Sequence, residues 1–285
     1  MAMGPNDLCF CSAPFLHVPL LDRLAPLRAA GFAALSISPG DVWALEAQGM
    51  AVRDIAARIG DAGLAIAELD CIACWMDHQQ QGADDDLSRL LRMLTPERVI
   101  ETAARLGALS VALIDMSPKP TPVDVAAQAF ARVCDMAAEH GLKAHIEFLP
   151  VGGIRSLADA WAIAAAAGRA NGGITLDAWH FHRSGSTLDL LATIPGQRIH
   201  AVQLCDALPS PLPDAWAELM TQRLLPGEGA IDLVGLIRTL DAIGCTAPTG
   251  VEVFNLRQND QSLANTARDW VTSTRAVQAK ARTRP

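Results

Sequence analysis

The chain has 285 residues, 51% of them hydrophobic and 19% charged, with a formal net charge of −8. This apolar content allows a large buried core and excludes a chain that is disordered by composition. The acidic balance argues against nucleic acid as a partner, because phosphate binding needs clustered basic residues. Lysine occurs only at Lys119, Lys143 and Lys280.

The expected location follows from the termini and the cysteines. No run of about 18 apolar residues is present, and no basic segment followed by an apolar one opens the chain. The seven cysteines, an odd number spread along the chain, fit a reducing compartment better than a disulfide framework. We therefore expect a cytoplasmic protein with no membrane partner. Residues 1–7 are expected to be disordered or foreign to the natural chain.

Short apolar runs alternate with segments of helical period along the whole sequence. Strands are expected at 8–14, 32–38, 64–69, 109–115, 143–148, 172–177, 198–204 and 249–255. Helices are expected at 20–30, 42–62, 87–106, 123–140, from Ser156 onward, 188–194, 232–243 and 261–280. Segment 206–229, with four prolines and two glycines, is too long for an ordinary connection and predicts a functional loop or lid.

Eight strand–helix pairs without a polar linker predict an α/β fold, a single (β/α)₈ TIM barrel domain spanning residues 1–285. The alternative is an open doubly wound sheet. It is disfavoured because no GxGxxG follows the first expected strand.

Oxygen donors stand at the carboxyl ends of the last four expected strands: Glu147, Asp177, Gln203 and Glu252. Reactive groups gather at this end of a parallel barrel, so the four are expected to converge. Three carboxylates in one barrel mouth would repel one another unless a positive charge neutralised them. With lysine so scarce, the pattern predicts one divalent cation, and an all-oxygen set favours Mn or Mg over Zn or Co.

Other polar residues have plainer interpretations. A lone carboxylate at a strand end is more often a helix cap or an ion-pair partner. His145 shares a side with Glu147 but lies deeper, which suggests a supporting role. Strand alternation places His200 on the opposite side from Gln203, so we expect it to be structural and bonded to backbone. Cys71 and Cys74 have CxxC spacing but no second cysteine pair, so we expect ordinary thiols.

The stretches IEFLP, LDAWHFHRSG, VQLCD, and LPGEGAIDLVGLI followed by GVEVFN resemble, in order and spacing, the xylose isomerase-like TIM barrel family. This family includes sugar phosphate isomerases and epimerases, hydroxypyruvate isomerase and certain 3-dehydroshikimate dehydratases. The resemblance implies that the same four strand-end residues bind the metal. The family often has His on strand seven, where this chain has Gln203, and that departure weakens a Zn reading.

The resemblance also implies a reaction. It predicts a metal-dependent isomerase or epimerase of a small sugar or hydroxy-keto substrate that passes through an enediolate. Glu147 and Glu252 would be the acid–base pair, with His180 donating to the developing oxyanion. The residues expected to contact substrate are Arg183, Arg223, Glu68, Glu228 and Trp179.

Three matters stay open at this point. A metal-dependent lyase of the 3-dehydroshikimate dehydratase type would begin with the same proton removal. A non-catalytic barrel that only binds a ligand is the third hypothesis. A homodimer, formed through segment 206–229, is also open.

Overall fold

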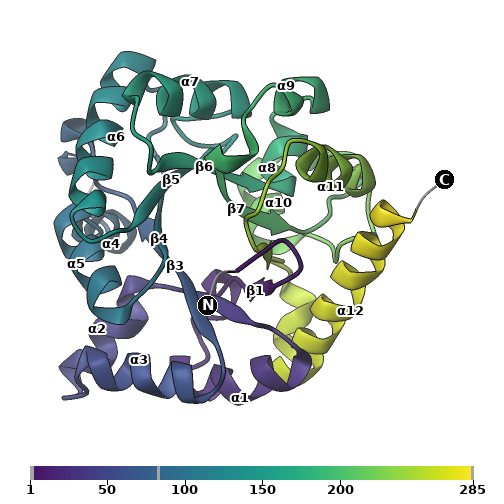
Figure 1. The fold of residues 1–285 in the computed structure, drawn as a ribbon, viewed down its shortest axis with the longest axis horizontal. Helices are drawn as coiled ribbons and strands as arrows, with labels where there is room; N and C mark the ends of the chain where they lie inside the picture. Colours follow the sequence, from purple (N-terminus) through teal and green to yellow (C-terminus); the bar gives the residue numbers. More distant parts are fainter. Residues whose placement is uncertain (1–2, 82–83, 284–285) are drawn as a thin grey trace.

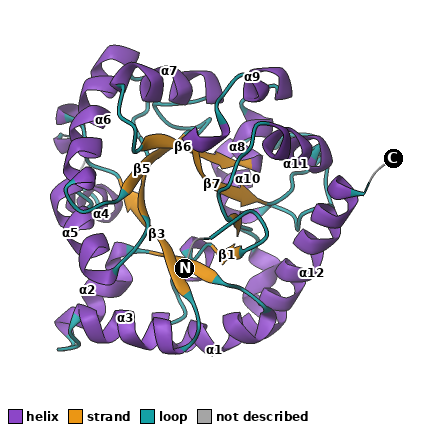
Figure 2. Cartoon of the chain, viewed as in Figure 1, coloured by secondary structure: helices purple, strands orange, loops and turns teal. Residues whose placement is uncertain are grey.

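The computed structural model describes residues 3–81 and 84–283. Eight parallel strands close into a barrel in chain order, with β1 paired to both β2 and β8. Figures 1 and 2 show the strands around the centre and the helices outside them. The (β/α)₈ prediction is confirmed, and the open sheet is excluded because its edge strands would be unpaired.

The strands are shorter than most of the expected runs. They are β1 (Leu8–Phe10), β2 (Ala34–Ile37), β3 (Ala65–Ile72), β4 (Ser110–Leu113), β5 (Lys143–Glu147), β6 (Gly172–Asp177), β7 (Ile199–Leu204) and β8 (Thr249–Val251). Every residue of β2, β4, β6 and β7 is buried. This matches their nearly continuous apolar sequences, since barrel strands are covered on both faces.

The helices form the outer layer. They are α1 (Leu20–Ala30), α2 (Pro39–Ala47), α3 (Val52–Asp61), α4 (Asp86–Met93), α5 (Pro96–Leu106), α6 (Val123–Ala138), α7 (Leu157–Ala167), α8 (Ala178–Arg183), α9 (Leu188–Ala192), α10 (Ala215–Thr221), α11 (Leu233–Ala242) and α12 (Leu263–Arg282). Within the described ranges, no helix has the length and apolar content needed to cross a membrane.

Two of the expected helices are each divided in the structure. The 42–62 segment becomes α2 and α3, separated at Gly49, whose φ of 92° is left-handed and incompatible with a continuing helix. The 87–106 segment becomes α4 and α5, separated where Pro96 opens the second helix. Proline fits the first helical turn but disfavours helical backbone in the residue before it.

The two segments expected to be irregular are both more ordered than expected. Segment 206–229 contains α10, and its ends are joined by an antiparallel bridge between Asp206 and Leu224. Residues 3–7 were expected to be disordered. The Gly4 amide donates to Asp7, and the Pro5 carbonyl accepts from Thr249 and Gln278. Residues 1 and 2 lie outside the described residues.

A register slip between β6 and β7 changes the position of one histidine. Ile174 pairs with Ile199, but Thr175 pairs with Ala201, so His200 is an extra residue on β7. A bulge breaks the alternation of side chains on which the parity argument depended. A Cβ atom built on Gly173 would lie 2.6 Å from His200 Nε2, and the His145 and His200 ring centroids are 6.2 Å apart. His200 therefore faces the barrel interior, and the opposite expectation is wrong.

Candidate functional site

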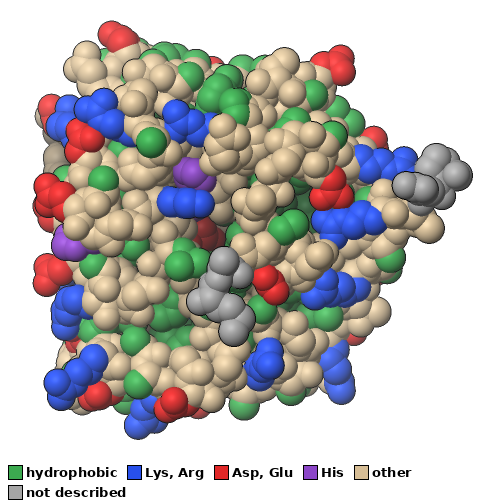
Figure 3. Space-filling view, viewed as in Figure 1, with side chains coloured by type: hydrophobic (Ala, Val, Ile, Leu, Met, Phe, Trp, Pro, Cys, Tyr) green, Lys and Arg blue, Asp and Glu red, His purple; other side chains and the backbone are tan. Residues whose placement is uncertain are grey.

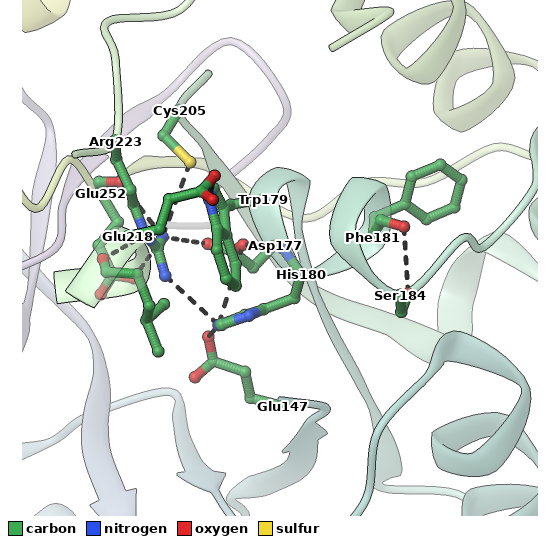
Figure 4. Close-up of polar contacts among 11 residues, drawn as sticks. Glu147, Asp177, Trp179, His180, Phe181, Ser184, Cys205, Glu218, Arg223 and Glu252 are labelled. Atoms are coloured by element: carbon green, nitrogen blue, oxygen red, sulfur yellow. Dashed lines mark hydrogen bonds and ion pairs between the residues drawn. The ribbon is translucent and has the colours of Figure 1, made fainter. Parts of the chain in front are cut away.

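The carboxyl ends of β5, β6 and β8 bring three carboxylates together, as Figure 4 shows. Glu147, Asp177 and Glu252 are 6%, 0% and 4% exposed. Asp177 also caps α8, since its Oδ1 accepts from the His180 amide at 2.7 Å. This cap places the His180 ring in the cluster, with Nε2 3.3 Å from Glu147 Oε1. The expected convergence of these residues is therefore present.

Arg223 supplies a positive charge beside the carboxylates, where the sequence predicts only a divalent cation. Its Nη1 lies 2.8 Å from Asp177 Oδ2 and 3.2 Å from Glu252 Oε2, and its side chain is 1% exposed. Its Nη2 lies 3.4 Å from His180 Nε2. The guanidinium was expected to hold an anionic part of the substrate. In the structure it is instead bound to two of the predicted metal ligands (Figure 4).

The charges in this cluster shift one another's pKa values. Burial raises the pKa of Glu147 and Glu252 well above the usual range, and Arg223 acts in the opposite direction on both. Burial would also raise the pKa of Asp177, but Arg223 and His180 outweigh it and hold that pKa below its usual value. Burial lowers the pKa of His180 to about 4, so its ring is neutral near pH 7.

Two observations fit a bound divalent cation. Ligand atoms of Glu147, Asp177 and His180 all lie within 4.8 Å of one another. Gln203 pairs in register with Asp177, and its buried Oε1 has no hydrogen-bond partner among the described residues. A buried acceptor without a partner is costly unless it binds a cation or water. Because this set includes the His180 nitrogen, it does not favour Mn or Mg over Zn as an all-oxygen set would.

The strand-three acid at the barrel mouth is Asp70, which sequence reasoning missed. The third strand was expected to end at Leu69, whereas β3 continues to Ile72. The register of β3 with β4 shifts between Leu69 and Ile72, so alternation does not place Asp70; the effect of its charge on Glu68, Glu147 and Glu252 does place it near all three. Burial raises the pKa of Asp70 to about 6. Its negative charge in turn contributes to the raised pKa of Glu147.

Glu68 is not at the mouth and does not line it, contrary to the expectation. Its Oε2 lies 3.2 Å from His145 Nε2, deeper in the barrel. His145 is fully buried and also bonds to Thr175 Oγ1 at 2.6 Å and Ser110 Oγ at 3.0 Å. The supporting role expected of His145 agrees with these contacts.

Arg183 and Trp179 hold segment 206–229 against α8 through a residue that the sequence did not point out, Glu218. Glu218 Oε1 accepts from Arg183 Nε at 2.8 Å and from Trp179 Nε1 at 3.2 Å, and its Oε2 accepts from the Leu212 amide at 2.7 Å. Glu218 is 1% exposed. Arg183 was expected to bind substrate, but its guanidinium is engaged here and on the Leu208 carbonyl.

Of two other predicted residues, one lies apart from the carboxylates and one lies among them. Glu228 is exposed and lines a separate cavity of about 160 Å³ beside Trp270. Trp179 is 1% exposed and packs edge-on against the His180 ring at 5.4 Å. Cys71 and Cys74 are free thiols, as expected.

The Glu218 network should be a main support of this end of the barrel. We predict that Glu218→Gln lowers the free energy of unfolding by about 2 kcal/mol, because it leaves the largely covered Arg183 charge without its counter-ion. Urea denaturation followed by circular dichroism measures this change. Asp135→Asn is the control, since Asp135 pairs with Arg169 at the surface and should cost about 1 kcal/mol at most. Equal effects of the two substitutions would contradict the assigned role of Glu218.

Residues 24–274 match the model of the xylose isomerase-like TIM barrel family. An inosose isomerase of Bacillus licheniformis is 29% identical over 189 residues, which are 64% of this chain and 67% of that protein. A 3-dehydroshikimate dehydratase of Pseudomonas aeruginosa is 27% identical over 237 residues, 83% of this chain but 36% of that protein. The chain thus spans only about a third of the length of the dehydratase, and 55% of another inosose isomerase, from Bacillus velezensis.

Solved structures share the fold. One described as an IOLI protein with a binding zinc atom has a TM-score of 0.84 and 21% identity, covering 98% of this chain and 100% of that one. An L-ribulose 3-epimerase has a TM-score of 0.73 and 19% identity, covering 96% and 95%. The family match, covering most of the sequence, and the strand-end carboxylates agree. The chain belongs to the xylose isomerase-like TIM barrel family.

Proposed function

We propose that this protein is a divalent-metal-dependent isomerase or epimerase of a small polyhydroxy ketone, acting through an enediolate. The observation that carries the proposal is the convergence of Glu147, Asp177 and Glu252 (Figure 4), together with the unpaired Oε1 of Gln203, a residue level with Asp177 on the neighbouring strand. The similarity to inosose isomerases supports this reaction class. Because the named relatives are enzymes, catalysis is favoured over a barrel that only binds a ligand.

Glu147 and Glu252 are the proposed acid–base pair. Both are buried, and both have a pKa well above the usual value, so one can hold a proton near neutral pH while the other accepts one. They extend from different strands, β5 and beyond β8, toward the same space. One carboxylate would remove a proton from the carbon next to the carbonyl, and the other would return a proton. In an epimerisation that proton goes to the opposite face of the same carbon; in an isomerisation it goes to the former carbonyl carbon, and the hydroxyl proton moves to the former carbonyl oxygen.

Arg223 and His180 would stabilise the negative charge that develops on the substrate oxygen. Arg223 already lies among the carboxylates, so a small shift of its guanidinium would let it donate to that oxygen. His180 is neutral near pH 7, so its unpaired Nδ1 can be a donor in one tautomer.

Glu147, Asp177, Gln203 and Glu252, with His180 beside them, would hold the metal ion. When bound, a divalent cation would polarise the substrate carbonyl and favour ionised carboxylates. We propose Mn or Mg as the ion if the three carboxylates and the amide are its ligands; coordination by the His180 nitrogen would suit Zn as well. Zinc is named for one structural neighbour, so reconstitution with each ion followed by elemental analysis decides between them.

The second candidate is a lyase of the 3-dehydroshikimate dehydratase type. The specific observation in its favour is the similarity to such a dehydratase over 83% of this chain. Both reactions start by removing a proton beside a carbonyl, so the same carboxylates serve either one.

We also propose the cytoplasm as the location of the protein and a small molecule as its substrate.

The reaction class is tested with protein reconstituted in MnCl₂ and incubated in D₂O. We expect inosose to take up deuterium with no loss of water, measured by proton NMR and mass spectrometry. Dehydration of 3-dehydroshikimate would instead produce an aromatic product with new ultraviolet absorbance. Glu147→Gln and Glu252→Gln should each lower the rate about a thousandfold, because each removes a proton-transfer group.

The control for these variants is Glu97→Gln, an exposed residue of α5, which should retain the wild-type rate. Full activity in Glu147→Gln or Glu252→Gln would overturn the acid–base assignment. Absence of turnover together with an unchanged melting temperature on adding MnCl₂ would favour the ligand-binding barrel.

Asp70 should set the pH dependence through Glu147. The negative charge of Asp70 raises the pKa of Glu147, and Glu147 must be deprotonated to act as the base. Asp70→Asn should therefore move the rising acidic limb of the kcat/KM profile to lower pH, by about half a unit. Asp124→Asn, at an exposed position of α6, should leave the profile unchanged. A shift to higher pH would contradict this account.

We also propose that segment 206–229 forms a homodimer contact. Leu212, Trp216 and Met220 of this segment are large apolar side chains that are 36%, 42% and 37% exposed, and a contact with a second copy of the chain would cover them. Light scattering should give twice the chain mass, and Trp216→Glu should reduce it to the monomer. A monomeric wild-type protein would refute the contact.

A further inference from the structure

A second cavity, of about 360 Å³, lies at the amino-terminal end of the barrel, opposite the carboxylates. Figure 3 views this end and shows a hollow near the middle of the face, with basic and histidine side chains beside it. The polar residues that line it are Glu68, Ser110, Lys143, Gln197, His200 and Thr246. Its volume lies in the range of small-molecule sites, which begins at roughly 300 Å³.

His200 is the buried polar side chain in this cavity whose hydrogen bonding is incomplete. It is 8% exposed, and neither ring nitrogen makes a hydrogen bond of good geometry with a described residue; the backbone groups of Asn171 and Gly172 lie near enough only to raise its pKa slightly against the effect of burial. Two features of the barrel create the space that the His200 ring occupies. The bulge in β7 directs His200 inward, and any side chain at Gly173 would collide with it. Buried polar atoms normally have hydrogen-bond partners, so the His200 ring nitrogens are suited to hydrogen bonds with a bound ligand.

The charges around the cavity favour a negatively charged guest. Burial, then the charges of Lys143 and Arg198, lower the pKa of His200 to about 4, so near pH 7 the neutral ring offers one donor and one acceptor. Lys143 is exposed at the start of β5, and its side chain makes no hydrogen bond or ion pair with any described residue. Arg198 is occupied by the carbonyls of Arg169 and Gly172.

The other residues that line the cavity narrow the chemical class of the ligand. Cys9, Ala67, Ala201 and Val202 give the cavity an apolar side. Among the described residues, Lys143 is the one lysine or arginine in the lining, and the one acid there, Glu68, lies 3.2 Å from His145 and has a pKa that burial raises well above its usual value. A single cation suits a monoanion better than a phosphate dianion. The only cluster of metal-ligating side chains found in 3–81 and 84–283 is the one at the opposite end, so Glu68, His145 and His200 are not arranged as a metal site.

We propose that the amino-terminal cavity is a second binding site, for a small organic carboxylate. Its carboxylate would face Lys143 and accept a hydrogen bond from His200, and its apolar body would lie against Ala67 and Val202. The site is separate from the proposed catalytic centre, and the proposal does not depend on the protein's catalytic function.

Imidazole NMR of histidine-labelled protein tests the site directly. The probes are benzoate, its neutral isostere benzamide, and inorganic phosphate, and His200→Gln assigns the His200 signal. We expect benzoate to shift the His200 signal in a saturable way, whereas benzamide and phosphate do not. Lys143→Met should weaken benzoate binding about tenfold, because it removes a charge-assisted contact. Lys119→Met, at an exposed position after β4, is the matched control and should bind as the wild type does.

Several results would overturn the proposal. An unmoved His200 signal, or a shift of the His180 signal instead, would mean that benzoate does not bind in this cavity. Equal shifts with benzamide would show an apolar cavity with no charge preference, and equal shifts with phosphate would show a general anion site. If His200→Gln does not fold, a crystal soaked in benzoate locates the ligand. Density for benzoate beside Lys143 would support the proposal, and its absence there would refute it.

Discussion

The contact of the Arg223 guanidinium with Asp177 and Glu252 governs the charge balance of the barrel mouth. It joins two strand ends to segment 206–229 through one buried cation. Without it, three carboxylates would lie together in a region of low dielectric, where their mutual repulsion is strong. Because Arg223 belongs to segment 206–229, the position of that segment and the arrangement of Asp177 and Glu252 at the barrel mouth depend on each other. The Glu218 contacts with Arg183 and Trp179 hold the same segment from its other side.

This arrangement changes the argument for a metal. Scarcity of lysine made a divalent cation look necessary for charge balance, but a single arginine already offsets part of the negative charge. The stronger reason for a cation is the unpaired Oε1 of Gln203 next to Asp177. An excess of negative charge can be balanced by an ion pair such as that of Arg223. A buried acceptor such as Gln203 Oε1, which has no donor among the described residues, is more specific evidence for a bound ligand.

The architecture and the strand-end carboxylates could be predicted from sequence because both depend on local order. Alternating strands and helices with short links leave few topologies, and the carboxyl ends of parallel strands share one edge. Glu147, Asp177 and Glu252 lie where this reasoning puts them. Glu68 does not, because the prediction ended β3 three residues early, and that error hid Asp70.

The other errors involve partners that are distant in sequence. Arg183 looked free to bind substrate because nothing near it in the chain indicates Glu218, which lies 35 residues away. Arg223 likewise looked available, although it meets carboxylates from two strands. His200 was misplaced because a bulge cannot be seen in an apolar run such as RIHAVQL. Ion pairs between residues that are far apart in the chain, and shifts of strand register, leave no periodic pattern in the sequence. They can be found only from a structure.

The slip between Ile174 and Thr175 also makes the two ends of β7 independent. Above it, Asp177 stays level with Gln203, and below it Ile174 stays level with Ile199. An insertion or deletion at the slip would rearrange the lower rim and leave the upper rim unmoved. The barrel could therefore diversify what it recognises at one opening while the chemistry at the other is preserved.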